Sequence, residues 1–344
     1  MPCRGFYSAQ TMVNNLGFTL TPTSMIPFQD ATWPMLVVTF LAFAGNTFYP
    51  VFLRLLIWTM HKVLTKRISM QEPLRFLLDH PRRCYTLLFP SRVTWTLFSI
   101  LFALNFIDTL LIVTLDLDNS AVNNLAPGPR VLAALFQAAS ARHTGTSTFA
   151  LAKVNPGVQF SLVAMMYISI FPIAISIRSS DVNEEKGLAR YAPRTAPSDS
   201  QPAQTYLRNH MRSQLSFDLW YISAGVFMIC AAEADKVMSG ENTAFTVFSI
   251  LFEVMSAYGN VGLSLGTMST NTSLCGEFGT FGKLVICAMM LRGRHRGLPT
   301  SLDRPVILPG EEFCFEERSR DEVRERERQL EEKSMAKLQR PKTM

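Results

Sequence analysis

The stretch "EVMSAYGNVGLSLG" at Glu253–Gly266 places serine, asparagine and three glycines directly after an apolar run, and a second apolar run follows at 281–291. A break of this kind between two apolar helices is usually an ordinary connection. Within a bilayer, however, hydrocarbon offers its backbone N–H and C=O groups no hydrogen bonds, so protein must bury them or an aqueous path must face them. The interpretation therefore depends on whether the rest of the chain builds a membrane protein.

Long apolar windows indicate that it does. The chain of 344 residues is 48% hydrophobic and 17% charged, and its charges gather in a few segments. A helix needs roughly 20 apolar residues to cross the hydrocarbon core. We therefore expect an all-α, multi-pass membrane protein. The expected spans are 33–60, 93–115, 158–177 and 215–232, with the shorter run 281–291 as a weaker fifth.

The placement of basic residues predicts the orientation. The net charge of +6 would suit a nucleic-acid partner, but between the expected spans the lysines and arginines concentrate in 61–92 and 178–214. Under the positive-inside rule these two segments lie in the cytoplasm, and 116–157 and 233–280 face outward. This pattern argues against nucleic-acid binding. The six cysteines and five histidines form no ligand or catalytic cluster in the sequence, so we expect neither enzyme activity nor a cofactor.

The loop in the opening stretch has two counterparts. Each version combines a Ser-Ala pair, polar residues and a glycine, and each precedes an apolar helix: "YSAQTMVNNLGFTL" (7–20), "QAASARHTGTSTFAL" (137–151) and "VMSAYGNVGLSLG" (254–266). Short apolar helices at 130–140 and 242–259 lead into the second and third versions. The spacing predicts a repeated unit of span, pore helix, filter loop and span.

This unit divides the whole chain into segments. Two full units and one partial unit fit the pattern, and polar segments separate them. The predicted segments are a partial unit (1–60), a basic cytoplasmic loop (61–92), a full unit (93–178), a cytoplasmic linker (179–214), a second full unit (215–300) and a charged cytoplasmic tail (301–344).

The physics of the unit favours a cation path. A half-helix that ends at membrane depth directs the negative end of its dipole at the path. Glycines in the following loop allow backbone angles that turn carbonyl oxygens inward, where they replace the hydration shell of a cation. One isolated loop is better explained as a connection, but three matched loops favour a cation-selective pore.

At these motifs the chain resembles the Trk/Ktr/HKT superfamily of potassium transporters, and most closely its fungal Trk branch. The segments "NNLGFTL" (14–20), "SARHTGTSTFALAKVNPGVQ" (140–159) and "SAYGNVGLSLG" (256–266) are similar to the second, third and fourth filters of that family. The end of the last unit, "KLVICAMMLRGRHRGLPTSLDRPVILP" (283–309), resembles the fungal sequence. The resemblance implies K⁺ uptake across the plasma membrane, with Na⁺ as a second candidate ion and a homodimer as the assembly.

The resemblance also implies roles for individual residues. The filter glycines are Gly17, Gly145 and Gly262, whose neighbouring backbone carbonyls would face K⁺. Arg294 would be an electrostatic barrier or gate below the filter, and its alternative is an interfacial charge whose side chain reaches the membrane surface. The expected flanking filter residues are Asn15, Leu16, Phe18, His143, Thr144, Thr146, Asn260, Val261 and Leu263.

Two departures from the family bear on function. Each subunit of the family has four units, whereas this sequence contains three filter segments, so it is expected to be an N-terminally truncated transporter. The alternative is a non-conducting fragment that only assembles with intact subunits. In addition, Thr146 stands where bacterial relatives commonly have an aromatic residue after the third glycine.

Two acidic residues in apolar surroundings leave alternatives open. Glu253, at the end of the last pore helix, either binds filter N–H groups and raises cation occupancy or is a buried acid hydrogen-bonded behind the filter, which we favour. Asp108, inside a span, either hydrogen-bonds structurally to a neighbouring unit, which we favour, or relays protons. Gly45, Asn46 and Pro50 interrupt the first span and are consistent with a kink.

Overall fold

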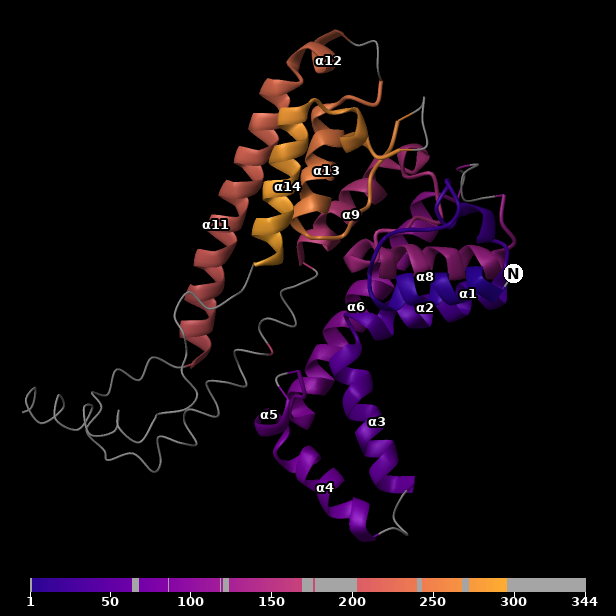
Figure 1. The fold of residues 1–344 in the computed structure, drawn as a ribbon, viewed down its shortest axis with the longest axis vertical. Coiled ribbons are helices and arrows are strands. Elements are labelled where there is room, and N and C mark those ends of the chain that lie inside the picture. Colours follow the sequence, from indigo (N-terminus) through magenta and orange to yellow (C-terminus); the bar gives the residue numbers. More distant parts are fainter. Residues whose placement is uncertain are drawn as a thin grey trace, which may run out of the picture. The chain divides into compact units, whose positions relative to one another are not determined.

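The computed structural model describes residues 2–63, 68–85, 87–117, 119, 124–168, 176, 203–239, 243–267 and 272–295. The regular structure in these residues is helical (Figure 1). All of them belong to one compact unit, and the second unit, 187–200 with 298–344, lies outside the described residues together with the predicted charged tail. The helices are α1 Pro2–Val13, η1 Ile26–Phe28, α2 Thr32–Gly45, α3 Tyr49–Val63, α4 Ile68–Asp79, α5 Pro81–Cys84, α6 Ser91–Leu115, α8 Pro127–His143, η2 Leu151–Lys153, α9 Pro156–Ile168, α11 Ala203–Ala232, α12 Ala234–Ser239, α13 Val247–Tyr258, η3 Leu274–Glu277 and α14 Thr280–Arg294.

Helix α6 has the residue distribution of a helix that faces lipid. Its exposed side includes Trp95, Phe102 and Phe106, whereas Asn105 and Asp108 are buried. In water this arrangement would expose apolar area and desolvate a carboxylate, and both cost free energy. In a bilayer, ionisable side chains within spans face the protein interior. The pattern therefore agrees with the expected membrane protein.

The apolar helices only partly match the expected spans. Within the described residues, α6 alone is both long and apolar enough to cross a membrane. The expected span 33–60 is divided into α2 and α3, which together pass the same test but meet at an angle of 95°. The break falls at Asn46, whose φ of −142° and ψ of −76° end α2, next to the residues that indicated a kink. Helix α9 covers the first part of 158–177, and residues 169–175 and 177 lie outside the described chain.

Two predicted connections contain helix. Most of the basic segment 61–92 forms α4 and α5 and the start of α6. Helix α11 begins at Ala203, inside the predicted linker 179–214. The apolar pattern alone located the start of this helix at its first apolar turn, twelve residues downstream.

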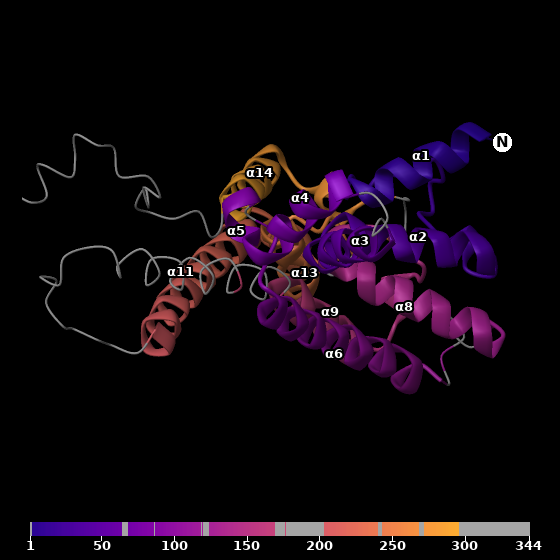
Figure 2. The same cartoon turned by 90° about the horizontal axis from the view of Figure 1, so that it is seen from below.

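The helices of the unit pack in a chain of neighbouring pairs. Helix α1 packs on α2, α2 on α8, and α8 on both α6 and α9. Helix α13 packs on α9, α11 and α14. Figures 1 and 2 show α1, α2 and α8 side by side, and α11, α13 and α14 as a second group that α9 connects to the first. Each of α1, α8 and α13 is followed by one of the three glycine loops.

Candidate functional site

The glycine loop of Gly145 touches those of Gly17 and Gly262 through the backbone. A Cβ atom on Gly17 would lie 3.4 Å from the carbonyl oxygen of Thr144, and one on Gly145 would lie 2.2 Å from the carbonyl oxygen of Val261. Thr144 and Val261 hold the same place in their loops, one residue before the glycine. In both pairs, therefore, the carbonyl that precedes one glycine approaches the glycine of the neighbouring loop. The same relation is repeated from loop to loop, as it would be around a common axis.

The backbone of these loops needs conformations that glycine and asparagine tolerate. Gly17, Gly145 and Gly262 have φ values of +75°, +69° and +90°. Asn15 and Asn260, each two residues before a glycine, both have φ of +53°. Asparagine is one of the few residues other than glycine that visits this left-handed region readily. The loops of Gly17 and Gly262 thus share one backbone pattern, in which asparagine ends the half-helix and glycine makes the next turn.

A buried hydroxyl at the end of each half-helix holds the loop that follows. Ser256 Oγ accepts a hydrogen bond of 3.1 Å from the N–H of Gly262. Ser140 Oγ accepts one of 3.0 Å from the N–H of Thr146 and donates one to the carbonyl of the same residue. Thr11 Oγ1 donates a bond of 2.9 Å to the carbonyl of Phe18. The hydroxyls fix the loop backbone without using the carbonyls that precede the glycines.

A second polar side chain, one turn earlier on two of these helices, holds the outer part of the loop. Gln137 Oε1 accepts a hydrogen bond of 3.0 Å from the N–H of Thr148. Glu253 Oε1 accepts one of 3.2 Å from the N–H of Cys275, which lies beyond the loop in η3. The favoured interpretation of Glu253, a buried acid hydrogen-bonded behind the loop, agrees with this contact.

A cavity of about 380 Å³ lies on the side of the loops where the half-helices end. Asn15, His143 and Asn260, each two residues before a loop glycine, all line it. Arg294, in the last turn of α14, lines the same cavity. The structure therefore brings together the three loops and the arginine that the resemblance singled out. The C-terminal, partly negative ends of α1, α8 and α13 are directed to this side, which favours a cation in the cavity.

Two helical glycines allow the following helices to approach the half-helices closely. A Cβ atom on Gly45 of α2 would lie 2.1 Å from the carbonyl oxygen of Val13, and one on Gly293 of α14 would lie 1.9 Å from that of Tyr258. Val13 and Tyr258 are both the last residues of their half-helices. Gly45 also lines the cavity, and Gly293 directly precedes Arg294. These glycines therefore set the width of the cavity at two matching places.

The chemistry available at the loops is that of backbone oxygens. Among the described residues, no group of three or more His, Cys, Asp or Glu side chains could hold a metal ion. In the same part of the chain, the carbonyls of Leu16, Thr144 and Val261 accept no hydrogen bond. Phe18, Thr146 and Leu263 follow the three glycines; Phe18 is exposed, and Thr146 and Leu263 are buried. Unbonded carbonyls of this kind are suitable ligands for a dehydrated alkali cation.

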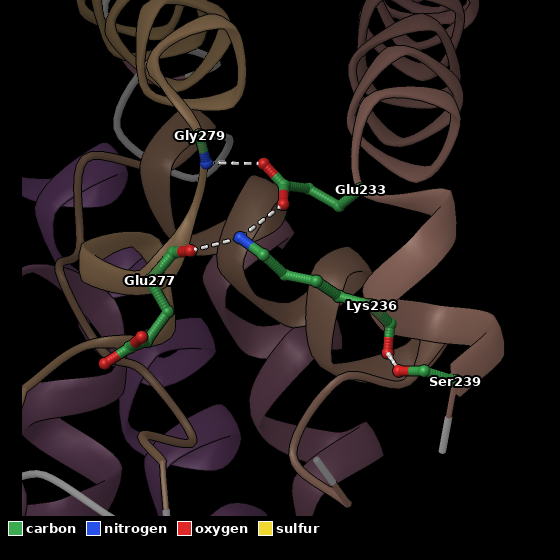
Figure 3. A network of polar contacts seen from close by, with 5 residues as sticks. All are labelled: Glu233, Lys236, Ser239, Glu277 and Gly279. Carbon is green, nitrogen blue, oxygen red and sulfur yellow. Dashed lines mark hydrogen bonds and ion pairs between the residues drawn. The ribbon is translucent and has the colours of Figure 1, made fainter. Parts of the chain in front are cut away.

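The far end of the last unit is fastened by a polar network (Figure 3). Glu233, at the end of α11, accepts a hydrogen bond of 2.5 Å from the N–H of Gly279, which caps α14. Its second oxygen lies 2.7 Å from the ammonium nitrogen of Lys236, and that nitrogen donates a bond of 2.7 Å to the carbonyl of Glu277. A carboxylate at a helix N-terminus is favourable for both charge and hydrogen bonding. The network connects the end of α11 to the start of α14. Between these two helices the chain forms the half-helix α13.

Sequence reasoning missed or misplaced several of these residues. The Ser-Ala alignment pairs Ser8 with Ser140 and Ser256, but the residue that contacts the Gly17 loop is Thr11. Thr11 and Ser256 both lie six residues before their loop glycine. This spacing would have identified Thr11, whereas the Ser-Ala match pointed to Ser8. Gly45 and Gly293 carried no signal of their own, because close approach depends on a distant segment. Asp108 does make a hydrogen bond, but to Ser161 of its own unit (2.8 Å) rather than to a neighbouring unit.

The sequence is similar to those of known cation transport proteins. The family model described as "TrkH: Cation transport protein" matches residues 3–315. "Potassium transport protein 1" of Schizosaccharomyces pombe is 44% identical over 90% of the chain and 36% of its own length. "Low-affinity potassium transport protein" of Saccharomyces cerevisiae is 42% identical over 90% of the chain and 38% of its own. "Putative potassium transport protein DDB_G0292412" of Dictyostelium discoideum is 33% identical over 85% and 40%.

The chain thus spans between a third and two fifths of the length of these relatives. The family match covers most of the chain and includes all three glycine loops and Arg294. The all-helical structure, with lipid-type exposure on α6, is what a membrane protein of that kind requires. The chain belongs to the TrkH family of cation transport proteins and is a membrane protein.

Proposed function

We propose that the protein is a subunit of a potassium uptake system of the plasma membrane, in which the three glycine loops form parts of one ion filter. The observation that carries the proposal is the repeated backbone contact: the carbonyl before one glycine approaches the glycine of the next loop, from Thr144 to Gly17 and from Val261 to Gly145. Matched loops from repeated units, arranged around one axis, are how carbonyl filters are built. The relatives named as potassium transport proteins support K⁺ as the ion.

The ion path runs from the outward-facing loops through the filter into the cavity. In the filter, the carbonyls of the residues around Gly17, Gly145 and Gly262 replace water around K⁺. In the cavity, the C-terminal ends of α1, α8 and α13 offset the cost of partial dehydration. Entry is driven by the membrane potential, which contributes about 2.3 kcal/mol per charge per 100 mV. No side-chain chemistry is needed, which suits transport rather than catalysis.

Arg294 acts in this scheme as a barrier below the filter. It lines the cavity together with Asn15, His143 and Asn260, so its guanidinium raises the free energy of a cation there by direct repulsion. The alternative, an interfacial charge with no effect on permeation, predicts no dependence of uptake on this residue. The cavity position favours the barrier.

The described loops form three parts of a ring, and a closed fourfold filter needs a fourth loop. A longer form of the protein would supply that loop from its own chain, and the homodimer implied by the family resemblance would then place one pore in each subunit. The second candidate function is a non-conducting fragment that assembles with intact subunits. It is favoured by the same count of loops. Na⁺ is a second candidate ion, because a fourth loop would contribute to selectivity.

Uptake in cells tests the proposal. The chain, alone and with whatever coding sequence lies upstream of Met1, is expressed in yeast cells that lack their own potassium uptake. We expect growth at low K⁺ and saturable Rb⁺ uptake from at least one of the two versions. Gly262→Ala, which places a Cβ at φ +90°, should reduce uptake, whereas Gly128→Ala in α8, where nothing lies within 4 Å, should not.

Each result has a defined meaning. If neither version supports Rb⁺ uptake while both reach the cell surface, the transport proposal is wrong. If only the extended version does, and the short chain lowers uptake by intact subunits, the short chain is a non-conducting partner. Equal uptake by Gly262→Ala and Gly128→Ala would contradict the placement of the loops in the ion path. Surface amount is measured for every variant, so that loss of folding is recognised.

A further inference from the structure

A buried arginine lies directly behind the third glycine loop. Arg142 is in the last turn of α8, three residues before Gly145, and only 1% of its surface is exposed. Its Nε donates a hydrogen bond of 3.1 Å to Asn105 Oδ1 on α6, and one of its terminal nitrogens contacts the Met165 sulfur on α9 at 3.6 Å. Asn105 in turn donates a bond of 2.7 Å to the carbonyl of Leu101. The guanidinium is therefore enclosed between two helices and the end of the half-helix.

The half-helices α1 and α13 have no such charge at this place. The corresponding residues, two after the bracing hydroxyl, are Val13 and Tyr258. A positive charge suits the C-terminal end of a helix through the helix dipole. Near a filter for cations, however, it repels the ion that the filter must hold. A buried guanidinium at this point needs a compensating negative charge.

Asp108 is the acid that supplies it. It lies on α6, one turn after Asn105, and is also 1% exposed. Ser161 of α9 donates a hydrogen bond of 2.8 Å to one of its oxygens. Its other oxygen and the Nη1 atom of Arg142 have no hydrogen-bond partner among the described residues. The two charges act on each other, yet they form no direct ion pair.

We propose that Asp108 is a positioning residue that neutralises the field of Arg142 at the third filter loop, so that a cation can occupy it. The pair binds no ion itself. The inference rests on the proposed function, because it concerns cation occupancy of the filter. It adds that one of the loops depends on a charge pair behind it, whereas the others do not.

A set of charge variants tests this in the transporting form of the protein. Asp108→Asn leaves the guanidinium uncompensated and should raise the KM for Rb⁺ uptake about tenfold, the size expected for one unit charge acting across a few side-chain lengths at protein dielectric. The double variant Asp108→Asn/Arg142→Gln removes both charges and should return the KM to within about twofold of the wild type. Asp108→Glu retains the charge and should also keep the KM low.

A matched control is present on the same helix. Asp116 is a buried acid at the end of α6 whose carboxylate accepts hydrogen bonds from Asn119 and Asn155 and also has one unbonded oxygen. Asp116→Asn should leave the KM unchanged even where it lowers the amount of protein. Melting temperatures in detergent are compared for all variants, since a purely structural role would change stability and maximal rate but not KM.

The outcomes separate this inference from the proposed function. Saturable Rb⁺ uptake by the wild type is required first, and its absence would count against the proposed function alone. With uptake present, an unchanged KM in Asp108→Asn contradicts the inference. A double variant whose KM stays as high as that of the single variant contradicts it as well, because the arginine would then not be the source of the effect.

Discussion

The third glycine loop, that of Gly145, differs from the loops of Gly17 and Gly262 in how it leaves its half-helix. In the loops of Gly17 and Gly262, asparagine takes the left-handed conformation that ends the helix, and the glycine makes a second turn two residues later. In the third loop, α8 continues to His143, and Gly145 itself is the residue with positive φ. One residue is therefore missing between the bracing hydroxyl, Ser140, and the glycine.

This difference explains where the third loop is held. With one residue fewer, the hydroxyl of Ser140 bonds to the residue after the glycine, Thr146, rather than to the glycine N–H as Ser256 does. The shorter loop also lies tightly against the fourth, since a Cβ on Gly145 would lie within 2.2 Å of a backbone oxygen. Three loops with one architecture thus differ in how much freedom each retains.

The largest expected effect compares alanine at two of the loop glycines. Both Gly145→Ala and Gly17→Ala place a Cβ at positive φ, which costs about 1–2 kcal/mol in either loop. Only Gly145→Ala also collides with the backbone of Val261, whereas Gly17→Ala meets one ordinary contact at 3.4 Å. Rb⁺ uptake per molecule at the cell surface should therefore fall at least about tenfold further in Gly145→Ala. Equal losses would show that the Gly145 loop packs no more tightly against its neighbour than the Gly17 loop does.

A smaller effect is expected from the bracing hydroxyls. Ser140→Ala removes an acceptor and a donor that both contact Thr146, whereas Ser256→Ala removes one acceptor. A buried group left without a partner costs roughly 1–3 kcal/mol. Both variants should be less stable in thermal unfolding in detergent, with Ser140→Ala the less stable of the two. Serine-to-threonine changes are the controls, because Thr11 fills this place naturally, and a stable Ser140→Ala would contradict the proposed brace.

The smallest effect tests the outer brace. Glu253→Gln gives the fourth half-helix the side chain that the third has at Gln137, and its amide oxygen can still accept the hydrogen bond from Cys275. Stability should change by less than about 1 kcal/mol, and the KM for Rb⁺ should rise by no more than roughly threefold. A larger rise without loss of stability would show that the carboxylate attracts the cation, which is the interpretation that we did not favour.

The sequence predicted the local features of the fold better than those that depend on contacts. The apolar run at 93–115, the half-helices before the loops of Gly145 and Gly262, and the loop glycines could be named from it, because run length and glycine spacing are local properties. The 95° break between α2 and α3 was only indicated by Gly45, Asn46 and Pro50, since its angle depends on packing. The start of α11 at Ala203 was missed because that part of the helix is polar.

The site shows the same division. Asn15, His143 and Asn260 were named with their glycines, but the sequence does not show that all three line one cavity with Arg294. The close approaches at Gly45 and Gly293 and the pair of Asp108 and Arg142 join segments far apart in the chain. Such contacts carry no signal in a single sequence. The three glycine loops are matched in sequence, and only the structure shows that they touch.

The most direct test of the central claim, that the three loops line one cation path, is to locate the ion. Anomalous diffraction from crystals of the purified protein in Rb⁺ or Tl⁺ would reveal bound cations. The account predicts a peak within coordination distance of backbone carbonyls from the loops of Gly17, Gly145 and Gly262, adjacent to the cavity lined by Arg294, and displaced by K⁺. Well-ordered loops with no peak between them, and cations bound only elsewhere, would contradict it.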